Sequence, residues 1–104
     1  MKKVAVFGGS GFLGLYLSEE LKRRGYDVTV ADINKPKESF NFIKCDITND
    51  RELEAVFSNS FDIVYNLAGL ANIDEANSNP LHTMQLNVVS NIKIIDLCVK
   101  HNIN

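Results

Sequence analysis

Short, mainly apolar runs alternate along the chain with segments in which apolar residues recur every three or four positions. The runs at 4–7, 28–31, 42–45 and 61–65 are rich in β-branched and aromatic residues, and each is followed by glycine, aspartate or asparagine. Apolar runs of this length are typical of strands buried on both faces of a parallel sheet. We therefore predict four parallel strands.

Three further segments show helical periodicity. The first ends at Gly25, a frequent C-cap residue, and its expected buried stripe consists of Leu13, Leu17 and Leu21. The second extends from about Arg51 to Ser58, with Thr48 as a candidate cap. The third begins at Pro80, and its expected buried face consists of Met84, Val88, Ile92, Ile95 and Val99. The polar stretch 70–79 is predicted to be a loop.

The predicted order is strand, helix, strand, short loop, strand, helix, strand, helix. This alternation is typical of the α/β class, with an open, doubly wound parallel sheet and flanking helices. Right-handed crossovers place the strands in the order 3-2-1-4, which is part of a Rossmann fold. We expect residues 1–104 to form a single domain that is truncated before a fifth strand.

Composition narrows the classes of function. The chain has 104 residues, 45% hydrophobic and 23% charged, and a formal charge of −2, which argues against nucleic acid as a partner. Cys45 and Cys98 lack metal-ligand spacing, which indicates reduced thiols and no metal site. No segment reaches the roughly 18 apolar residues of a membrane span, and the N-terminus lacks a signal-peptide cleavage site. We expect a cytoplasmic protein that binds no membrane.

A glycine-rich loop follows the first predicted strand. Gly9, Gly11 and Gly14 satisfy G-x-G-x-x-G, while Gly8, Gly11 and Gly14 satisfy G-x-x-G-x-x-G. Either pattern suits a dinucleotide site, because a tight turn without β-carbons lets a pyrophosphate approach the backbone. The N-terminus of the following helix then offers free N–H groups and partial positive charge to the phosphates.

Asp32 lies at the end of the second predicted strand, eighteen residues after Gly14. A carboxylate at this place can accept hydrogen bonds from both hydroxyls of an adenosine ribose. Its charge would repel a 2′-phosphate, which favours NAD over NADP, while Lys35 and Lys37 keep NADP possible. The alternative interpretation of Asp32 is a turn or helix-cap aspartate.

The stretch 6–14, the helix after it and the run 28–32 resemble the start of the extended short-chain dehydrogenase/reductase family, the NAD-dependent sugar-nucleotide epimerases and dehydratases. That family usually carries Thr-Gly-Gly-x-Gly-Phe-Ile-Gly in the loop, and Phe7 stands here in the threonine position. The resemblance implies that the loop binds the cofactor through Gly8, Gly11, Phe12, Leu13 and Gly14.

Three more places resemble this family. The resemblance implies that Asp46 bonds the adenine amino group and that Ile47 covers the ring. It also implies that the backbone of Leu67, Ala68 and Gly69 lines the ribose and phosphate, and that Asn87 steadies the active-site backbone. Alternatively, Asp46 starts the next helix, 67–69 is an ordinary strand end and Asn87 is a polar helix position.

The family's chemistry rests on a Tyr-x-x-x-Lys pair. The residues four positions after Tyr16, Tyr26 and Tyr65 are Glu20, Val30 and Gly69, so no tyrosine here fits, and we predict no catalytic residue in this chain. His82 and His101 are too isolated for a metal site and are expected on the surface or at helix ends. The adjacent pair Asp74 and Glu75 is not expected to act as an acid and a base.

Three hypotheses follow. In the first, the chain is the NAD(P)-binding part of an epimerase or dehydratase that acts on a nucleotide-linked sugar. In the second, it is a dinucleotide-binding module that senses redox state without catalysis. In the third, it is a structural fragment that binds nothing well because half of its cofactor cleft is missing. The bare edge of the fourth strand and the unpaired face of the last helix predict self-association.

Overall fold

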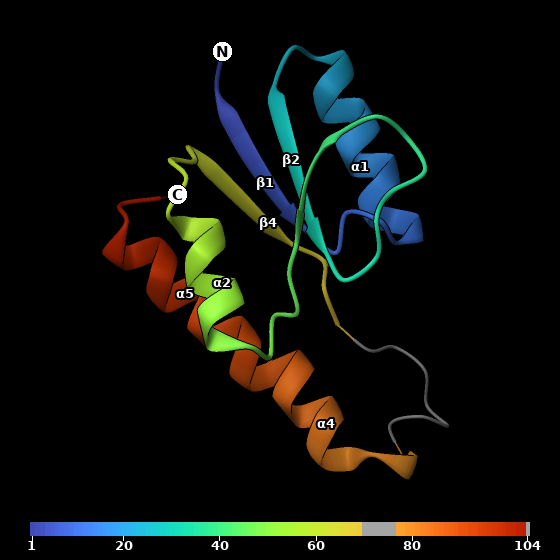
Figure 1. Cartoon of the computed structure of the whole chain (residues 1–104), viewed down its shortest axis with the longest axis vertical. Helices are drawn as coiled ribbons and strands as arrows, with labels where there is room; N and C mark the ends of the chain where they lie inside the picture. Colours follow the sequence, from blue (N-terminus) through green and yellow to red (C-terminus); the bar gives the residue numbers. More distant parts are fainter. Residues whose placement is uncertain (70–76, 104) are drawn as a thin grey trace.

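The computed structural model describes residues 1–69 and 77–103, which form one parallel sheet with helices on both faces (Figure 1). The strands are β1 (Lys3–Phe7), β2 (Asp27–Asp32), β3 (Asn41–Lys44) and β4 (Ile63–Asn66), in the order β3-β2-β1-β4. The helices are α1 (Phe12–Arg23), α2 (Asp50–Phe57), α4 (Pro80–Met84), the π-helical η1 (Gln85–Val89) and α5 (Ser90–Lys100). The predicted class, strand order and partial Rossmann fold are confirmed.

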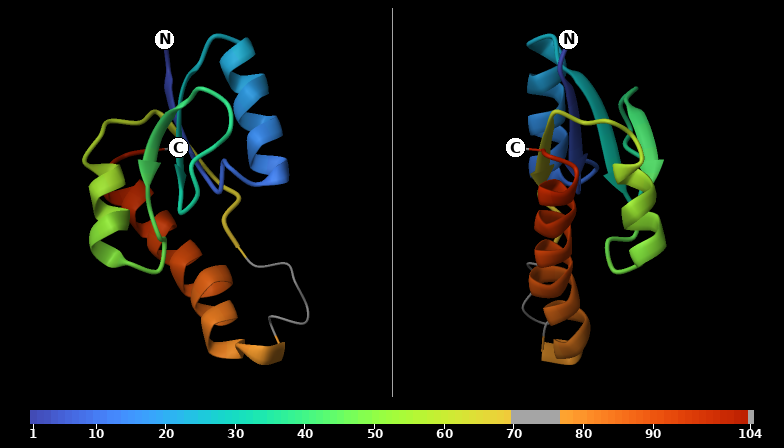
Figure 2. Two further views of the ribbon diagram at one scale, coloured as in Figure 1. Left: turned by 45° about the vertical axis from the view of Figure 1, so that its right-hand side comes forward. Right: turned by 90° about the vertical axis from the view of Figure 1, so that its left-hand side faces the viewer.

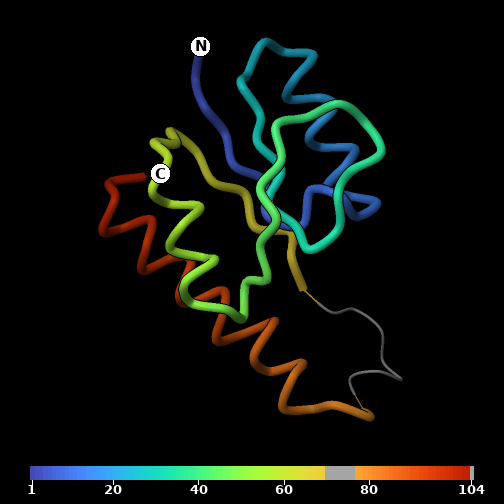
Figure 3. The backbone as a smooth tube through the Cα atoms, in the orientation of Figure 1, coloured from blue at the N-terminus to red at the C-terminus, as the bar shows by residue number. Residues whose placement is uncertain are grey.

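The backbone path explains the strand order. After β2 the chain reaches β3 through a loop without a helix, whereas α1 connects β1 to β2 and α2 connects β3 to β4 (Figure 3). Residues 70–76 of the predicted loop 70–79 lie outside the described residues, and so do Asp74 and Glu75. The stretch from α4 through η1 to α5 then forms one long helix that extends past the sheet (Figure 2).

The register of the sheet brings the ends of the strands together. Phe7 of β1 is opposite Ala31 of β2 and Asn66 of β4, and Asp32 is opposite Lys44 of β3. The residues that follow each strand therefore emerge at one edge of the sheet, its carboxyl edge. In open α/β sheets this edge is where ligands bind.

β1 is the most deeply buried element, because all four residues from Val4 to Phe7 are inaccessible to solvent. Val4 and Val6 pack with Leu21 of α1 on one face of the sheet. Ala5 and Phe7 point to the other face, where the larger core lies against α2 and α5 and includes Leu53, Val56, Phe57, Phe61 and Ile94. The continuous apolar run at 4–7 thus fills two cores at once, as expected for a central parallel strand.

The predicted buried face of the last helix is wrong. Met84, Val88, Ile92, Ile95 and Val99 are 45–70% exposed, and the buried positions are Ser90 and Ile94. This helix is apolar around much of its circumference, so periodicity alone does not select the face that packs. The predicted residues do share one side of the helix, but this side faces solvent.

Two smaller expectations also differ from the structure. Leu13 is 64% exposed, because α1 packs on the sheet through Gly14, Ser18 and Leu21. The rest of the predicted stripe does pack, since Leu21 is buried in the smaller core and Leu17 lies against it. The cap of α2 is Asn49 and not Thr48, since the Asn49 side chain accepts a hydrogen bond of 3.1 Å from the backbone N–H of Glu52.

No helix in the described ranges 1–69 and 77–103 is long and apolar enough to cross a membrane.

The burial of neighbouring residues in α5 predicts opposite outcomes for the same substitution. Ile94 is 2% exposed and packs in the larger core, whereas Ile95 is 56% exposed. We expect Ile94→Ala to lower the free energy of unfolding by about 2–5 kcal/mol. Ile95→Ala should change it by about 0.5 kcal/mol at most. Urea unfolding followed by circular dichroism measures both, and a larger loss for Ile95→Ala would contradict this packing.

Candidate functional site

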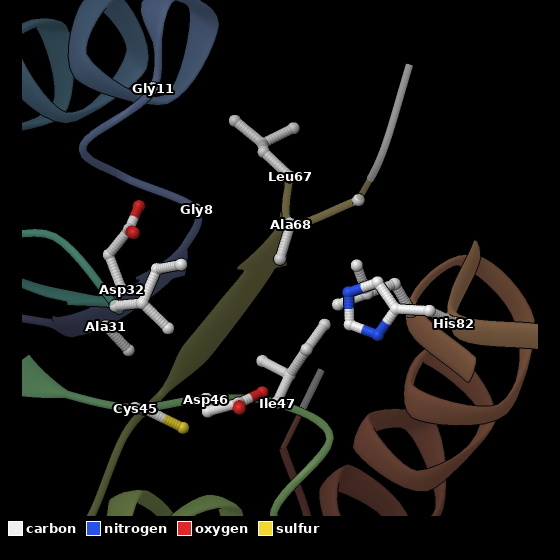
Figure 4. Close-up of a pocket in the computed structure, with 13 residues that line it drawn as sticks. Gly8, Gly11, Ala31, Asp32, Cys45, Asp46, Ile47, Leu67, Ala68 and His82 are labelled. Carbon is white, nitrogen blue, oxygen red and sulfur yellow. The ribbon is translucent and has the colours of Figure 1, made fainter. Parts of the chain in front are cut away.

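A cavity of about 360 Å³ opens at the carboxyl edge of the sheet (Figure 4). Its walls come from the β1–α1 loop, the residues that follow β2, β3 and β4, and one face of α4 and η1. The lining residues are Gly8, Gly11, Ala31, Asp32, Ile33, Cys45, Asp46, Ile47, Leu67, Ala68, Gly69, His82 and Leu86. The strand register described above is what places these separate segments around one space.

Gly8 lies where the β1–α1 loop touches the end of β4. Its φ of 75° lies in the left-handed region that favours glycine. A β-carbon there would also lie 2.7 Å from the backbone N of Ala68. The Gly8 N–H donates to the carbonyl of Ala31 at 2.9 Å, so the loop is joined to β2 as well. Only glycine fits at this junction.

Gly14 joins α1 to the same loop. A β-carbon on Gly14 would collide with the carbonyl oxygen of Gly8, so α1 packs directly on the turn that precedes it. Gly11 is the N-cap residue of α1, and its N–H donates to the Gly8 carbonyl at 3.2 Å. No side chain of the described residues caps this end of α1. The amides of its first turn, with their partial positive charge, therefore remain available beside the cavity.

Asp32 is held rigidly at the cavity wall. Its Oδ2 accepts a hydrogen bond of 3.0 Å from the backbone N–H of Ser10, and its Oδ1 accepts one of 3.0 Å from that of Asn34. The Ser10 hydroxyl completes the link by donating to the Asn34 carbonyl at 2.5 Å. Each carboxylate oxygen retains acceptor capacity. Asp32 therefore forms a turn and joins β2 to the glycine loop. Its charged carboxylate lies at the cavity wall.

Asp46 and Ile47 follow β3. Oδ1 of Asp46 accepts hydrogen bonds from the Thr48 hydroxyl at 2.7 Å and from the Thr48 N–H at 2.9 Å. These two bonds hold the pKa of the Asp46 carboxyl below its usual value, and the bond from the hydroxyl has the larger effect. The charge of His82 makes a smaller contribution. Asp46 thus begins the turn into α2 and still lines the cavity, while buried Ile47 joins the larger core to the cavity wall.

The end of β4 is tied in place by asparagines. The Asn66 Oδ1 accepts a hydrogen bond of 3.1 Å from the Ala68 N–H, and its Nδ2 donates to Asn91 Oδ1 at 2.9 Å. The Leu67 N–H donates to the Phe7 carbonyl at 2.8 Å, which continues the ladder with β1. A β-carbon on Gly69 would lie 3.0 Å from Asn87 Oδ1, so Asn87 of η1 lies beside this segment.

The cavity brings together most of the residues suggested by the sequence. Eight of them line it, namely Gly8, Gly11, Asp32, Asp46, Ile47, Leu67, Ala68 and Gly69. Gly14 lies beneath the loop instead, and Asn87 is next to Gly69 and outside the lining. The Phe12 side chain is 89% exposed and that of Leu13 64%, and neither lines the cavity.

Sequence reasoning missed Ala31, Ile33, Cys45, His82 and Leu86 as lining residues. Ile33 and Cys45 are direct neighbours of Asp32 and Asp46, so their position in the sequence could have indicated that they line the cavity. His82 and Leu86 are four residues apart, the spacing of one helical face.

Burial, followed by the nearby Glu52 and Asp46 charges, raises the pKa of the Cys45 thiol to about 12, so this cysteine is protonated and unreactive.

The cavity combines fixed acceptors, free amides and apolar surface. Asp32 presents carboxylate oxygens held by backbone amides, and the uncapped end of α1 presents free N–H groups. Ile47 and Leu86 supply apolar surface at the wall that Asp46 shares. The fold and this site define a Rossmann-type nucleotide-binding protein.

Residues 4–104 match the NAD-dependent epimerase/dehydratase family, and the chain belongs to this family. It is 29% identical, over 97% of its length, to the bifunctional UDP-glucose 4-epimerase and UDP-xylose 4-epimerase 1 of Pisum sativum. It is 32% identical, over 94% of its length, to the bifunctional protein GAL10 of Candida maltosa, of which it covers 74%.

Solved structures agree with this assignment. The chain is similar to the UDP-glucose 4-epimerase of Thermus thermophilus in complex with NAD, with a TM-score of 0.86, 25% identity and 98% of this chain covered. An epimerase from Methanothermobacter thermautotrophicus superposes with a TM-score of 0.88 at 26% identity over 98% of this chain. The chain spans about a third of the length of the Pisum sativum protein and of both solved structures.

The glycine contacts predict unequal tolerance of an added methyl group. Gly14→Ala should lower the free energy of unfolding by about 1–3 kcal/mol, because the new β-carbon meets the Gly8 carbonyl. Gly11→Ala is the matched control, since the nearest atom to its β-carbon, the Gly8 oxygen, is 3.5 Å away. We expect Gly11→Ala to cost less than about 1 kcal/mol. Equal losses in thermal unfolding would show that α1 does not rest on this turn.

Proposed function

We propose that residues 1–104 form one NAD-binding unit that holds the adenosine and pyrophosphate of the cofactor for a nucleotide-sugar epimerase or dehydratase. The observation that carries this proposal is the Asp32 carboxylate, which two backbone amides fix at the cavity beside the glycine loop. Membership of the epimerase/dehydratase family supports this function, and so do the relatives that are named as UDP-sugar epimerases.

Each wall of the cavity has a part in binding. Asp32 accepts hydrogen bonds from the adenosine ribose, and the amides of the first turn of α1 bind the pyrophosphate. Asp46 accepts a hydrogen bond from the adenine amino group, while Ile47 and Leu86 exclude water from the ring. The bound nicotinamide supplies a hydride acceptor, which is the chemistry that this family requires of its cofactor. The negative charge of Asp32 selects NAD over NADP.

The proton transfer that accompanies hydride transfer needs groups that this sequence does not show. None of the three tyrosines is followed by lysine four positions later. We therefore assign no catalytic residue within 1–104 and propose that the Tyr-x-x-x-Lys pair belongs to a further part of the enzyme. The same observation leaves one competing function, a redox-sensing module that binds the dinucleotide without chemistry. A Tyr-x-x-x-Lys motif in the coding sequence after Asn104 would decide for the enzyme.

Cofactor binding is tested by isothermal titration calorimetry with NAD, NADP and ADP-ribose. We expect NAD and ADP-ribose to bind, and NADP to bind more weakly. Asp32→Asn should weaken NAD binding about 10- to 100-fold, because hydrogen bonds to a charged acceptor are lost. Asp96→Asn, which alters an exposed carboxylate paired with Lys100, is the control and should have no effect. Absence of any binding by a sample that circular dichroism shows to be folded would contradict the proposal.

We propose also that the chain associates with a second copy of itself. The α4–α5 stretch exposes a row of apolar side chains, which we call the apolar stripe, consisting of Leu81, Met84, Val88, Ile92, Ile95 and Val99. They recur every three or four residues, the spacing of one side of a helix. An exposed apolar row of this length favours burial against an equivalent surface.

The oligomeric state measures this association. Light scattering after gel filtration should show a mass that rises with concentration, and Ile92→Lys should shift the protein toward the monomer. Tyr16→Lys, which changes an equally exposed apolar residue on α1, should leave the mass unchanged. A monomer at every concentration would overturn the proposal.

A further inference from the structure

His82 projects into the cavity from α4, opposite the residues that follow β3 (Figure 4). Leu86 lines the same wall one helical turn later, so this side of the long helix faces the cavity while the apolar stripe faces solvent. Asp46, which follows β3, lines the same cavity, and His82 makes a minor contribution to the lowered pKa of its carboxyl. An acidic and a basic side chain therefore line the same part of the cavity, with Ile47 between them in the view of Figure 4.

The two side chains offer complementary hydrogen-bonding groups. Thr48 donates both of its hydrogen bonds to Oδ1 of Asp46, so Oδ2 keeps its acceptor capacity for a ligand. A histidine ring carries at least one N–H in either protonation state, so His82 is a donor. Within the described residues, no group of three or more histidine, cysteine and carboxylate side chains could hold a metal ion.

We propose that His82 and Asp46 together read the edge of the adenine ring, so that His82 is a residue that selects adenine over hypoxanthine and guanine. Asp46 accepts a hydrogen bond from the exocyclic amino group, and His82 donates one to the adjacent ring nitrogen. Adenine presents a donor beside an acceptor on this edge. Hypoxanthine and guanine present an oxygen acceptor beside a ring N–H, which is the reverse order. The carboxylate would then face an oxygen acceptor, and the imidazole N–H that bonds adenine would face a ring N–H.

This inference rests on the proposed binding of NAD. It adds His82, which neither the glycine loop nor the carboxylate of Asp32 indicates as a binding residue. The ribose and pyrophosphate contacts do not depend on the base. They are therefore the same for NAD and for nicotinamide hypoxanthine dinucleotide, an analogue in which an oxygen replaces the adenine amino group and the adjacent ring nitrogen carries a hydrogen. The ratio of the two affinities isolates the contribution of Asp46 and His82 from the rest of the site.

The test is calorimetry of both dinucleotides with the unmodified chain and with His82→Phe, His82→Gln and His101→Gln. We expect the unmodified chain to bind NAD about tenfold or more tightly than the hypoxanthine analogue. His82→Phe should weaken NAD binding several-fold and leave the analogue nearly unaffected, so that the ratio falls. His82→Gln keeps an N–H donor and should retain most of the ratio.

His101 provides the matched control, because it contacts the Phe57 ring at a centroid distance of 5.7 Å, outside the cavity lining. His101→Gln should leave both affinities unchanged. In nitrogen NMR spectra, the His82 ring signals should shift on addition of NAD and much less on addition of the analogue. NAD binding with an unchanged ratio in His82→Phe would overturn this inference alone. Failure of the unmodified chain to bind either dinucleotide would overturn the proposed function and this inference with it.

Discussion

The close contact of three backbone segments at Gly8 is the constraint on which the rest of the structure depends. The glycine loop touches the end of β4 on one side, where a β-carbon would lie 2.7 Å from Ala68 N, and it carries α1 on the other through Gly14. Because no side chain separates these segments, the strand ends, the N-terminus of α1 and the 67–69 segment surround one small space. A larger residue at Gly8 or Gly14 would move α1 away from that space.

A structural role and a binding role coincide at each of the two carboxylates in the cavity. Asp32 and Asp46 each follow a strand, and each accepts hydrogen bonds from nearby backbone amides. Such bonds favour the charged form and restrict the side chain, so the structural role of each aspartate prepares its binding role. The alternatives of turn residue and ligand are therefore compatible here. As the pH falls through the lowered pKa of Asp46, the stability that its charged form contributes is lost and its hydrogen bonds lose the support of the charge.

Local patterns were enough to predict most of the fold and much of the candidate site. The runs at 4–7 and 28–31 are apolar on both faces and end at Gly8 and Asp32, so strand, turn and carboxylate all follow from neighbouring residues. Parallel pairing then requires these ends to meet at one edge. The prediction failed for the α4–α5 helix, where apolar residues lie on both sides. Periodicity chose the Ile92 and Ile95 side, whereas the sheet packs against Ser90 and Ile94.

The sequence by itself determined the order of the elements, the glycine turn and the positions of Asp32 and Asp46, because each depends on the conformation of a few adjacent residues. Only the tertiary structure decided which side of the last helix is buried and that His82 and Leu86 complete the cavity. Those outcomes depend on the rotation of a helix about its own axis, which its own apolar periodicity does not determine when apolar residues lie on both sides. They depend also on contacts between segments distant in sequence, such as the hydrogen bond that joins Ser10 to Asp32. No local pattern encodes that rotation or those contacts.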